Sequence, residues 1–219
     1  MAPETRSRSL ADRETKTTAG ALVSRLEAYG ITQAFGIPGT HLLPLYRELS
    51  KSSIRHVTPR HEQGGGYAAD AYARVTRRPA ACFVTTGPGL LNIAAAAAQA
   101  HHDSVPMVVV APGVPTDIEG RDTGYLHEVK DQHGVMNALV ADAHRVRGPS
   151  DAAAAVDRLM GSFAARRPRP AYLEVPVNLM DARGQVPTEL PERTSVPAPD
   201  LGSIGSAAAL ISSADSVQL

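Results

Sequence analysis

Two short stretches of this chain, residues 79–85 and 105–111, are apolar at almost every position. A strand with apolar side chains on both faces belongs inside a sheet that is covered on both sides. The segment between them, 90–102, is rich in alanine and has the spacing of a helix. A strand, a helix and a second strand in succession predict a parallel pair. The two stretches therefore predict an α/β fold.

The same alternation runs along most of the chain. The patterns predict further strands at 33–37, 54–57, 143–146 and 171–175, and further helices at 17–29, 40–51, 61–75 and 151–166, the last of them capped by Ser150. Such alternation is typical of a parallel sheet with helices on both faces. Residues 113–132 are polar with little periodicity, and loops of that length are usually functional or mobile.

The ends of the chain differ in composition from its middle. Residues 1–16 are charged and have no apolar segment, so they do not form a secretory signal, and we expect a disordered leader. The main domain is predicted to span 17–181. Four prolines in polar sequence indicate an extended linker over 182–201. Residues 202–219 are predicted to form a helix and the start of a strand, the truncated start of a second α/β domain.

Charge and cysteine content exclude several classes of protein. The chain carries 22 Lys and Arg against 22 Asp and Glu, so we expect no electrostatic field that would attract nucleic acid. A single cysteine, Cys82, excludes a disulfide framework and favours a reducing compartment, the cytoplasm. No apolar run reaches the length of a membrane span, so no membrane partner is expected.

Residues 60–66 read Arg-His-Glu-Gln-Gly-Gly-Gly, which places Glu62 at the start of a predicted helix with three glycines behind it. Each glycine inside a helix costs about 1 kcal/mol relative to alanine. Their presence indicates a close approach that only a bare backbone allows. On the residues alone, Glu62 is either a catalytic carboxyl or a helix-starting charge that complements the macrodipole.

Two glycine turns follow predicted strands. Thr85-Thr86-Gly87-Pro88-Gly89 comes after a buried strand, and Pro38-Gly39 comes after the first predicted strand. Ligands of open α/β sheets bind at the carboxyl ends of the strands. These turns and Glu62 are therefore candidates for one site.

Six motifs follow one another over residues 17–181. They are Phe-Gly-Ile-Pro-Gly at 35–39, Arg-His-Glu-Gln-Gly at 60–64, Ala-Ala-Asp-Ala-Tyr-Ala-Arg at 68–74, Thr85 to Gly89 with Asn92, Asp-Ser-Val-Pro-Met at 103–107, and 170–176. Together they resemble the amino-terminal, pyrimidine-binding domain of thiamine-diphosphate-dependent enzymes of the acetolactate synthase and 2-oxo acid decarboxylase family. Any one of them is weak, and their common order and spacing make the resemblance strong.

The resemblance implies thiamine diphosphate as the cofactor and a role for each matched residue. Glu62 would be the catalytic carboxyl, bonded to N1′ of the pyrimidine ring. The implied cofactor-binding residues are Pro38, Gly39, Glu62, Thr85, Gly87, Pro88 and Asn92, and the implied substrate residues are His61, Gln63, Glu128 and Asp131. Glu128 and Asp131 lie three apart, so a helical turn would place both carboxylates on one face, where they could receive a guanidinium group.

Members of this family also carry a diphosphate-binding domain, in which a Gly-Asp-Gly motif helps to hold Mg²⁺. This sequence contains no Gly-Asp-Gly, so it offers no metal ligands and supplies half of an active site. The expected partner is a diphosphate-binding domain or subunit with that motif, in a homo- or hetero-oligomer (a dimer or tetramer). The chain alone is expected to be inactive, and FAD, bound by some members through the central domain, stays possible.

The choice of reaction stays open at this point. Residues 36–41, 57–62 and 126–132 look most like the branch that decarboxylates 5-guanidino-2-oxopentanoate, which implies a lyase acting on a small 2-oxo acid. One alternative is a fragment of an acetolactate synthase large subunit, a transferase that joins pyruvate units in branched-chain amino-acid synthesis. The other is a pyrimidine domain without catalysis that acts as a binding partner.

Overall fold

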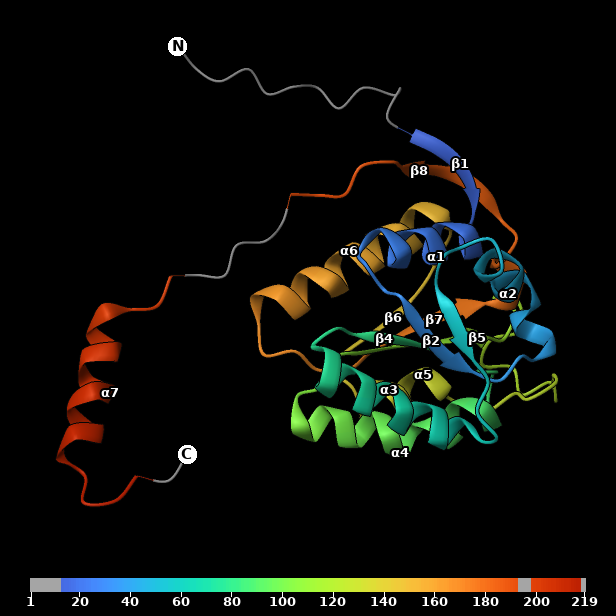
Figure 1. Cartoon of the computed structure of the whole chain (residues 1–219). Coiled ribbons are helices and arrows are strands. Elements are labelled where there is room, and N and C mark those ends of the chain that lie inside the picture. The colour runs from blue at the N-terminus through green and yellow to red at the C-terminus, as the bar shows by residue number, and fades with distance from the viewer. Residues whose placement is uncertain (1–12, 193–197, 218–219) are drawn as a thin grey trace, which may run out of the picture.

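The computed structural model describes residues 13–192 and 198–217 (Figure 1). Six parallel strands form the central sheet in the order β3-β2-β4-β5-β7-β6. Their bounds are β2 Gln33–Gly36, β3 Arg55–Val57, β4 Ala80–Phe83, β5 Met107–Gly113, β6 Asp142–Arg145 and β7 Ala171–Pro176. The predicted parallel sheet is confirmed, with all six predicted strands within a few residues of their expected places.

Helices cover both faces of the sheet, as predicted (Figure 1). One face carries α1 Thr18–Ala28, α2 Leu43–Leu49 and α6 Pro149–Ala165, and the other carries α3 Glu62–Thr76, α4 Pro88–Asp103 and the short α5 Gln132–Asn137. Short 3-10 helices, η2 Thr40–Leu42 and η3 Val177–Leu179, complete the domain. Within residues 13–192 and 198–217, no helix is long and apolar enough to cross a bilayer.

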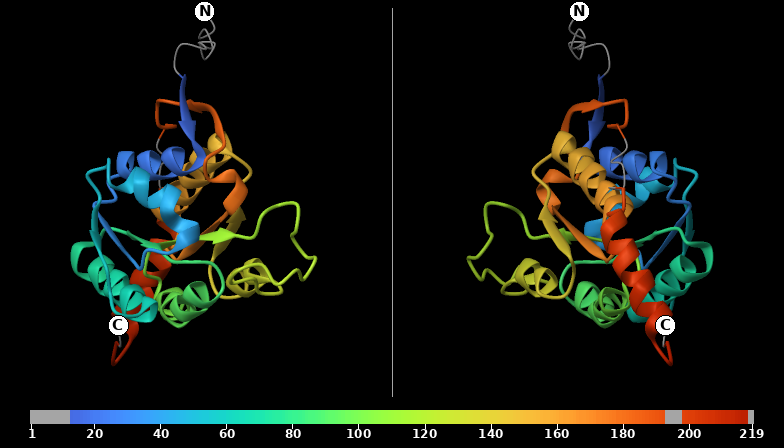
Figure 2. Two further views of the ribbon diagram at one scale, coloured as in Figure 1. Left: turned by 90° about the vertical axis from the view of Figure 1, so that its right-hand side faces the viewer. Right: turned by 90° about the vertical axis from the view of Figure 1, so that its left-hand side faces the viewer.

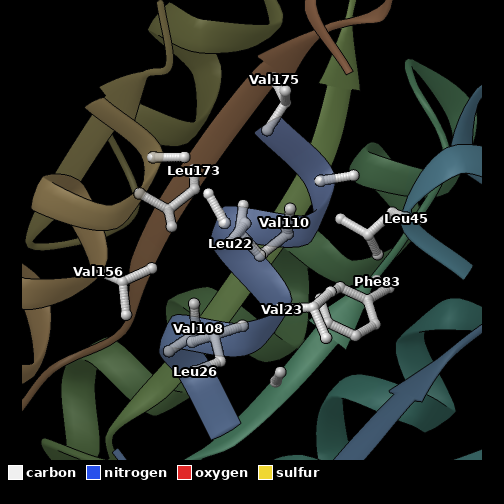
Figure 3. Close-up of a cluster of buried hydrophobic side chains, with 14 of the residues drawn as sticks. Leu22, Val23, Leu26, Leu45, Phe83, Val108, Val110, Val156, Leu173 and Val175 are labelled. Atoms are coloured by element: carbon white, nitrogen blue, oxygen red, sulfur yellow. The ribbon is translucent and has the colours of Figure 1, made fainter. Parts of the chain in front are cut away.

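Strand β5 shows why a sheet covered on both sides needs a continuous apolar run. Its side chains alternate between two cores, as strand geometry requires. Val108 and Val110 pack with α1 and α6, beside Leu22 and Leu26 (Figure 3). Met107, Val109 and Ala111 pack on the opposite face under α3 and α4. Cys82 of β4 lies buried in this second core as a free thiol.

A two-stranded antiparallel sheet corrects two predictions about the chain ends. Strand β1, Arg13–Thr17, pairs with β8, Arg183–Pro187. Residues 13–16 are therefore not a disordered leader, while residues 1–12 lie outside the described part of the chain. Part of the expected linker is likewise ordered, because the buried Arg25 donates hydrogen bonds of 2.8 Å to the carbonyls of both Pro187 and Glu189.

Smaller differences concern helix ends. Helix α6 begins at Pro149 with Gly148 as its N-cap, so Ser150 is not the cap. The helix predicted to begin at residue 202 is present as α7, Leu201–Ser213, apart from the domain and exposed along its whole length (Figure 1). Residues 216–217 do not form the strand that we expected, and 218–219 lie outside the described residues. The connection from β5 to α5 projects from the body of the domain (Figure 2).

Two of the three glycines in α3 are explained by packing. A Cβ atom at Gly66 would lie 2.6 Å from Cβ of Ala96, and one at Gly65 would lie 2.9 Å from Cγ of Pro59. Neither fits without movement, because α4 lies close against α3 at Gly66 and the turn before α3 lies close at Gly65. A Cβ at Gly64 would meet no atom of the chain within 4 Å. Packing within this domain therefore does not require glycine at position 64.

The glycines of α3 give a matched pair of variants. Gly66→Ala should lower the free energy of unfolding by about 1–3 kcal/mol, because the added methyl overpacks the contact with α4. Gly64→Ala should raise it by up to about 1 kcal/mol, because alanine is the better helix former. Urea denaturation followed by circular dichroism measures both. Equal destabilisation by the two substitutions would contradict this account of the helix contact.

Candidate active site

Three turns meet at the carboxyl ends of the strands. They follow β2, β3 and β4 and carry Gly39, Glu62 and Thr85. A Cβ atom at Gly39 would lie 3.0 Å from Oγ1 of Thr85, and one at Gly89 would lie 3.3 Å from Oε1 of Glu62. The glycine turns therefore lie against Thr85 and against the Glu62 carboxylate. Sequence reasoning predicted a site at this edge, and the structure brings these residues together there.

Glu62 is the first residue of α3 and is half-buried. The preceding residue, His61, is the N-cap, and its Nδ1 accepts the backbone N–H of Gln63 at 3.2 Å. Across the gap between helices, Nδ2 of Asn92 in α4 donates to Oε2 of Glu62 at 2.8 Å. The carboxylate is therefore held by one side-chain hydrogen bond at the meeting point of α3 and α4.

The Gly-Pro-Gly turn requires its first glycine on two grounds. Gly87 has φ of +61°, a conformation that side chains disfavour. A Cβ there would also lie 2.2 Å from the carbonyl oxygen of His127. Pro88 is the first residue of α4 and is exposed, as is Pro38 in the turn after β2. The conformation of the turn is thus constrained by the backbone at Gly87 and by the loop that carries His127.

The side chain of Gln132 binds the Gly87 turn to the neighbouring strands. Its Oε1 accepts the N–H of Gly87 at 3.1 Å, and its Nε2 donates to the carbonyl of Pro112 at 2.7 Å and to Oε2 of Glu174 at 3.0 Å. The hydroxyl of Tyr172 donates to the same Glu174 oxygen at 2.9 Å. Burial, and then the charge of Glu174, raises the pKa of Tyr172, which keeps that hydroxyl protonated. Gln132 thus couples β5 and β7 to the turn.

Sequence reasoning did not single out this network. Two signals were present in the sequence. Gln132 closes the motif at 126–132, and Glu174 places a charge inside the apolar run 171–175. A charge buried in a strand has a partner as a rule, so Glu174 pointed to a polar contact across the core.

A cluster of three rings, those of His41, Tyr125 and His127, joins the loop between β5 and α5 to the turn after β4. His41 is buried, and its Nδ1 lies 3.1 Å from Oγ1 of Thr86. Its ring stacks on Tyr125 at a centroid distance of 5.4 Å, with His127 edge-on at 6.1 Å. Burial, and then the proximity of His127, lowers the pKa of His41. His41 was not among the predicted site residues, although the motif at 36–41 ends on it.

The expected helical turn joining Glu128 to Asp131 is wrong. Glu128 lies in the loop before α5, where its Oε2 accepts the N–H of Tyr125 at 2.9 Å and the hydroxyl of Thr123 at 3.1 Å. The bond from Tyr125 lowers the pKa of Glu128. Asp131 is the N-cap of α5 and accepts the N–H of Gly134 at 2.7 Å. Each carboxylate satisfies free backbone donors, which helix starts and turns leave open.

The two carboxylates nevertheless line one small cavity of about 50 Å³. Its charged lining residues are the carboxylates of Glu119, Glu128, Asp131 and Glu174 and the cations Lys130 and Arg145. Arg145 pairs with Glu119, and its Nε lies 3.2 Å from Oε1 of Glu174. Four carboxylates against two cations leave the cavity acidic.

Comparison with known proteins places this chain in a family. The family model described as "Thiamine pyrophosphate enzyme, N-terminal TPP binding domain" matches residues 16–135. These residues include all of the turns described above. The chain belongs to this family. The match confirms the resemblance and the fold that the sequence motifs predicted, and it makes thiamine diphosphate the cofactor of the class.

Curated relatives of this thiamine pyrophosphate enzyme domain include proteins that are 34–42% identical to it over the aligned residues. They include "Probable 2-ketoarginine decarboxylase AruI" of Pseudomonas aeruginosa (42% over 169 residues, 77% of this chain and 30% of the relative). The acetolactate synthase large subunit of Parasynechococcus marenigrum is 37% identical over 167 residues (74% and 27%), and isozyme 1 of Escherichia coli is 34% identical over 201 (90% and 35%). The chain spans about a third of the length of these relatives.

The residues at this edge of the TPP-binding domain fit the pyrimidine half of the cofactor. A half-buried carboxylate stands beside Gly89, whose missing side chain leaves Oε1 of Glu62 uncovered on that side. Such a group suits a ring nitrogen that gains and loses a proton. For the diphosphate half, the described residues hold no group of three His, Cys, Asp or Glu side chains that could bind a metal ion.

Gln132→Leu tests the buried network. The substitution keeps the volume but leaves the Gly87 N–H without its acceptor and removes one of the hydrogen bonds to the buried Glu174 carboxylate. The free energy of unfolding should fall by about 3 kcal/mol, because each buried unsatisfied group costs about 1–3 kcal/mol. The exposed Gln99→Leu, as a control, should stay within about 0.5 kcal/mol of the parent in the same urea titration. Equal effects of the two variants would refute the role given to Gln132.

The lowered pKa of His41 predicts a pH dependence. Its folded pKa lies below the unfolded value of 6.5, so the unfolded state takes up the proton first as the pH falls. The stabilisation is complete above about pH 6.5 and is lost as the pH falls towards the folded pKa. Between pH 7.5 and 5.5, His41→Asn should therefore lose less stability than the parent chain, whereas the exposed His102→Asn should follow the parent. A parent-like slope in His41→Asn would be the contradictory result.

Proposed function

We propose that this chain supplies the pyrimidine-binding half of the active site of a thiamine-diphosphate-dependent 2-oxo acid decarboxylase, with Glu62 as the carboxyl that activates the cofactor. The observation that carries the proposal is the Glu62 carboxylate, held by Asn92 at 2.8 Å where three strand-end turns meet. Ligands of parallel sheets bind at this edge. The family assignment supplies the ligand class.

Each residue has a part in this proposal. Bound thiamine diphosphate supplies a ring carbon that attacks the 2-oxo group of the substrate. Glu62 holds and moves a proton at N1′ of the pyrimidine ring, and Asn92 orients the Glu62 carboxylate by donating to its second oxygen. The remaining pocket-shaping residues are Pro38, Gly39, Thr85, Gly87 and Pro88, with His61 and Gln63 at the substrate side.

The other half of the site comes from a partner in this proposal. The diphosphate and Mg²⁺ are held by a domain or subunit with Gly-Asp-Gly, a motif that is absent from this sequence. Gly64 and the exposed Tyr67 and Leu91 leave a surface on α3 and α4 for that partner. The complete enzyme is an oligomer in the cytoplasm, where a lone buried thiol such as Cys82 stays reduced. FAD belongs to the acetolactate synthase alternative.

The acidic cavity beside Gln132 supports a substrate with a cationic tail. Its four carboxylates exceed its two cations, and its volume of about 50 Å³ admits a group of a few heavy atoms. Guanidinium binds carboxylates through paired, charge-assisted hydrogen bonds. The relative named as a 2-ketoarginine decarboxylase has the same tail on its substrate. We therefore propose 5-guanidino-2-oxopentanoate as the substrate, with Glu128 and Asp131 binding its guanidinium group.

Glu62→Gln tests the catalytic assignment. A chimera in which residues 16–181 replace the matched segment of the 2-ketoarginine decarboxylase relative would supply the missing domains. The substitution should lower kcat by about 10²–10⁴-fold, because an amide cannot exchange a proton with N1′. The control Glu48→Gln, on α2 away from the site, should keep full activity. A kcat near that of the parent chimera in Glu62→Gln would reject the assignment.

Substrate preference tests the reaction. The chimera should have a higher kcat/KM for 5-guanidino-2-oxopentanoate than for pyruvate, and Glu128→Gln with Asp131→Asn should reduce that ratio by about tenfold or more, since a charge-assisted pair contributes at least about 1.4 kcal/mol. A preference for pyruvate would favour the acetolactate synthase alternative. A correctly folded chimera without turnover on either substrate would favour the binding-partner alternative.

A further inference from the structure

A second polar cavity, of about 230 Å³, lies at the opposite edge of the sheet. It is lined by the end of α6, by the connection to β7, and by the first residues of β6 and β7, Asp142 and Ala171. Parallel strands begin at this edge, whereas the Glu62 site lies where they end. The cavity is therefore separated from the candidate active site by the length of the strands.

Three arginines give this cavity a strong positive charge. Arg166, Arg167 and Arg169 all line it, and among the ion pairs of residues 13–192 none involves any of the three. Asp142 is the one carboxylate among the lining residues, and its Oδ2 lies 3.8 Å from Nε of a fourth arginine, Arg158. Three arginines, of which Arg166 and Arg167 are exposed and Arg169 is half-buried, thus line a cavity whose single carboxylate already faces another cation.

One of these arginines has an unmet hydrogen-bond donor. Nε of Arg169 is buried and has no acceptor, while its Nη1 donates to Nε2 of His101 at 3.1 Å. Burial, and then the charge of Arg169, lowers the pKa of His101, which favours the neutral imidazole that accepts this bond. A buried charged donor without an acceptor is destabilising. An anion bound by these arginines would supply the missing negative charge and, within reach of Nε of Arg169, the missing acceptor.

We propose that this cavity is a binding site for a small multivalent oxyanion, held by the guanidinium groups of Arg166, Arg167 and Arg169. The planar fork of arginine matches phosphoryl and carboxylate groups, which it binds through two parallel hydrogen bonds. Ser162 lines the same cavity and adds a neutral hydroxyl donor. The site is independent of the function proposed for Glu62.

Calorimetric titration of the chain with inorganic diphosphate and, separately, with citrate tests the proposal. One anion per chain should bind saturably. Arg166→Gln and Arg169→Gln should each weaken binding by about tenfold, the loss expected for one charge-assisted contact. Arg169→Lys keeps the charge but removes the fork, and it should also weaken binding. The control Arg77→Asn removes an exposed charge elsewhere, and asparagine tolerates its left-handed backbone (φ of +56°).

The two probes separate the possible sources of the anion. Tighter binding of diphosphate assigns a phosphoryl ligand and tighter binding of citrate a carboxylate ligand, and either supports the site. Absence of saturable binding up to about 10 mM of both probes would overturn it. So would an equal loss in Arg77→Asn, which would show that only net charge matters. Thermal unfolding of each variant near the parent's midpoint confirms that the fold is kept.

Discussion

The buried amide of Gln132 is the contact on which the geometry of the candidate active site depends. It is one residue beyond Asp131, the N-cap of α5, and its hydrogen bonds join Gly87 to Pro112 and Glu174. The Gly87 turn begins α4, and α4 carries Asn92 to within 2.8 Å of Glu62. One side chain thereby ties the paired strands β5 and β7 to α4, the helix whose Asn92 binds the catalytic candidate.

The alternation of strands and helices could be predicted because burial on both faces forces a recognisable pattern. Continuous apolar runs such as 105–111 indicate a covered strand, and Val108 and Val109 indeed enter opposite cores. The pairing of β1 with β8 could not be predicted, since both strands are short and polar and lie about 170 residues apart. The end of β8 is bound by Arg25, whose acceptors, the carbonyls of Pro187 and Glu189, lie far from it in the sequence.

The gathering of residues at the candidate site could be predicted where motifs carry chemistry, but not where side chains bind the backbone of their own loop. The motif around Glu62 and the Gly-Pro-Gly turn pointed to one edge of the sheet, and the structure brings Glu62, Gly89 and Asn92 together there. The spacing of Glu128 and Asp131 was misleading, because both carboxylates bind backbone N–H groups of their own loop. The glycines behind Glu62 serve two purposes: Gly65 and Gly66 allow packing, whereas Gly64 leaves open space.

A structure of the chimeric enzyme with bound thiamine diphosphate tests the central claim most directly. If Glu62 activates the cofactor, one of its carboxylate oxygens lies within about 2.6–3.2 Å of N1′, the reach of a hydrogen bond that transfers a proton, while Asn92 still donates to the other. A cofactor whose N1′ contacts a different side chain, with Glu62 bound only to Asn92, would contradict the account.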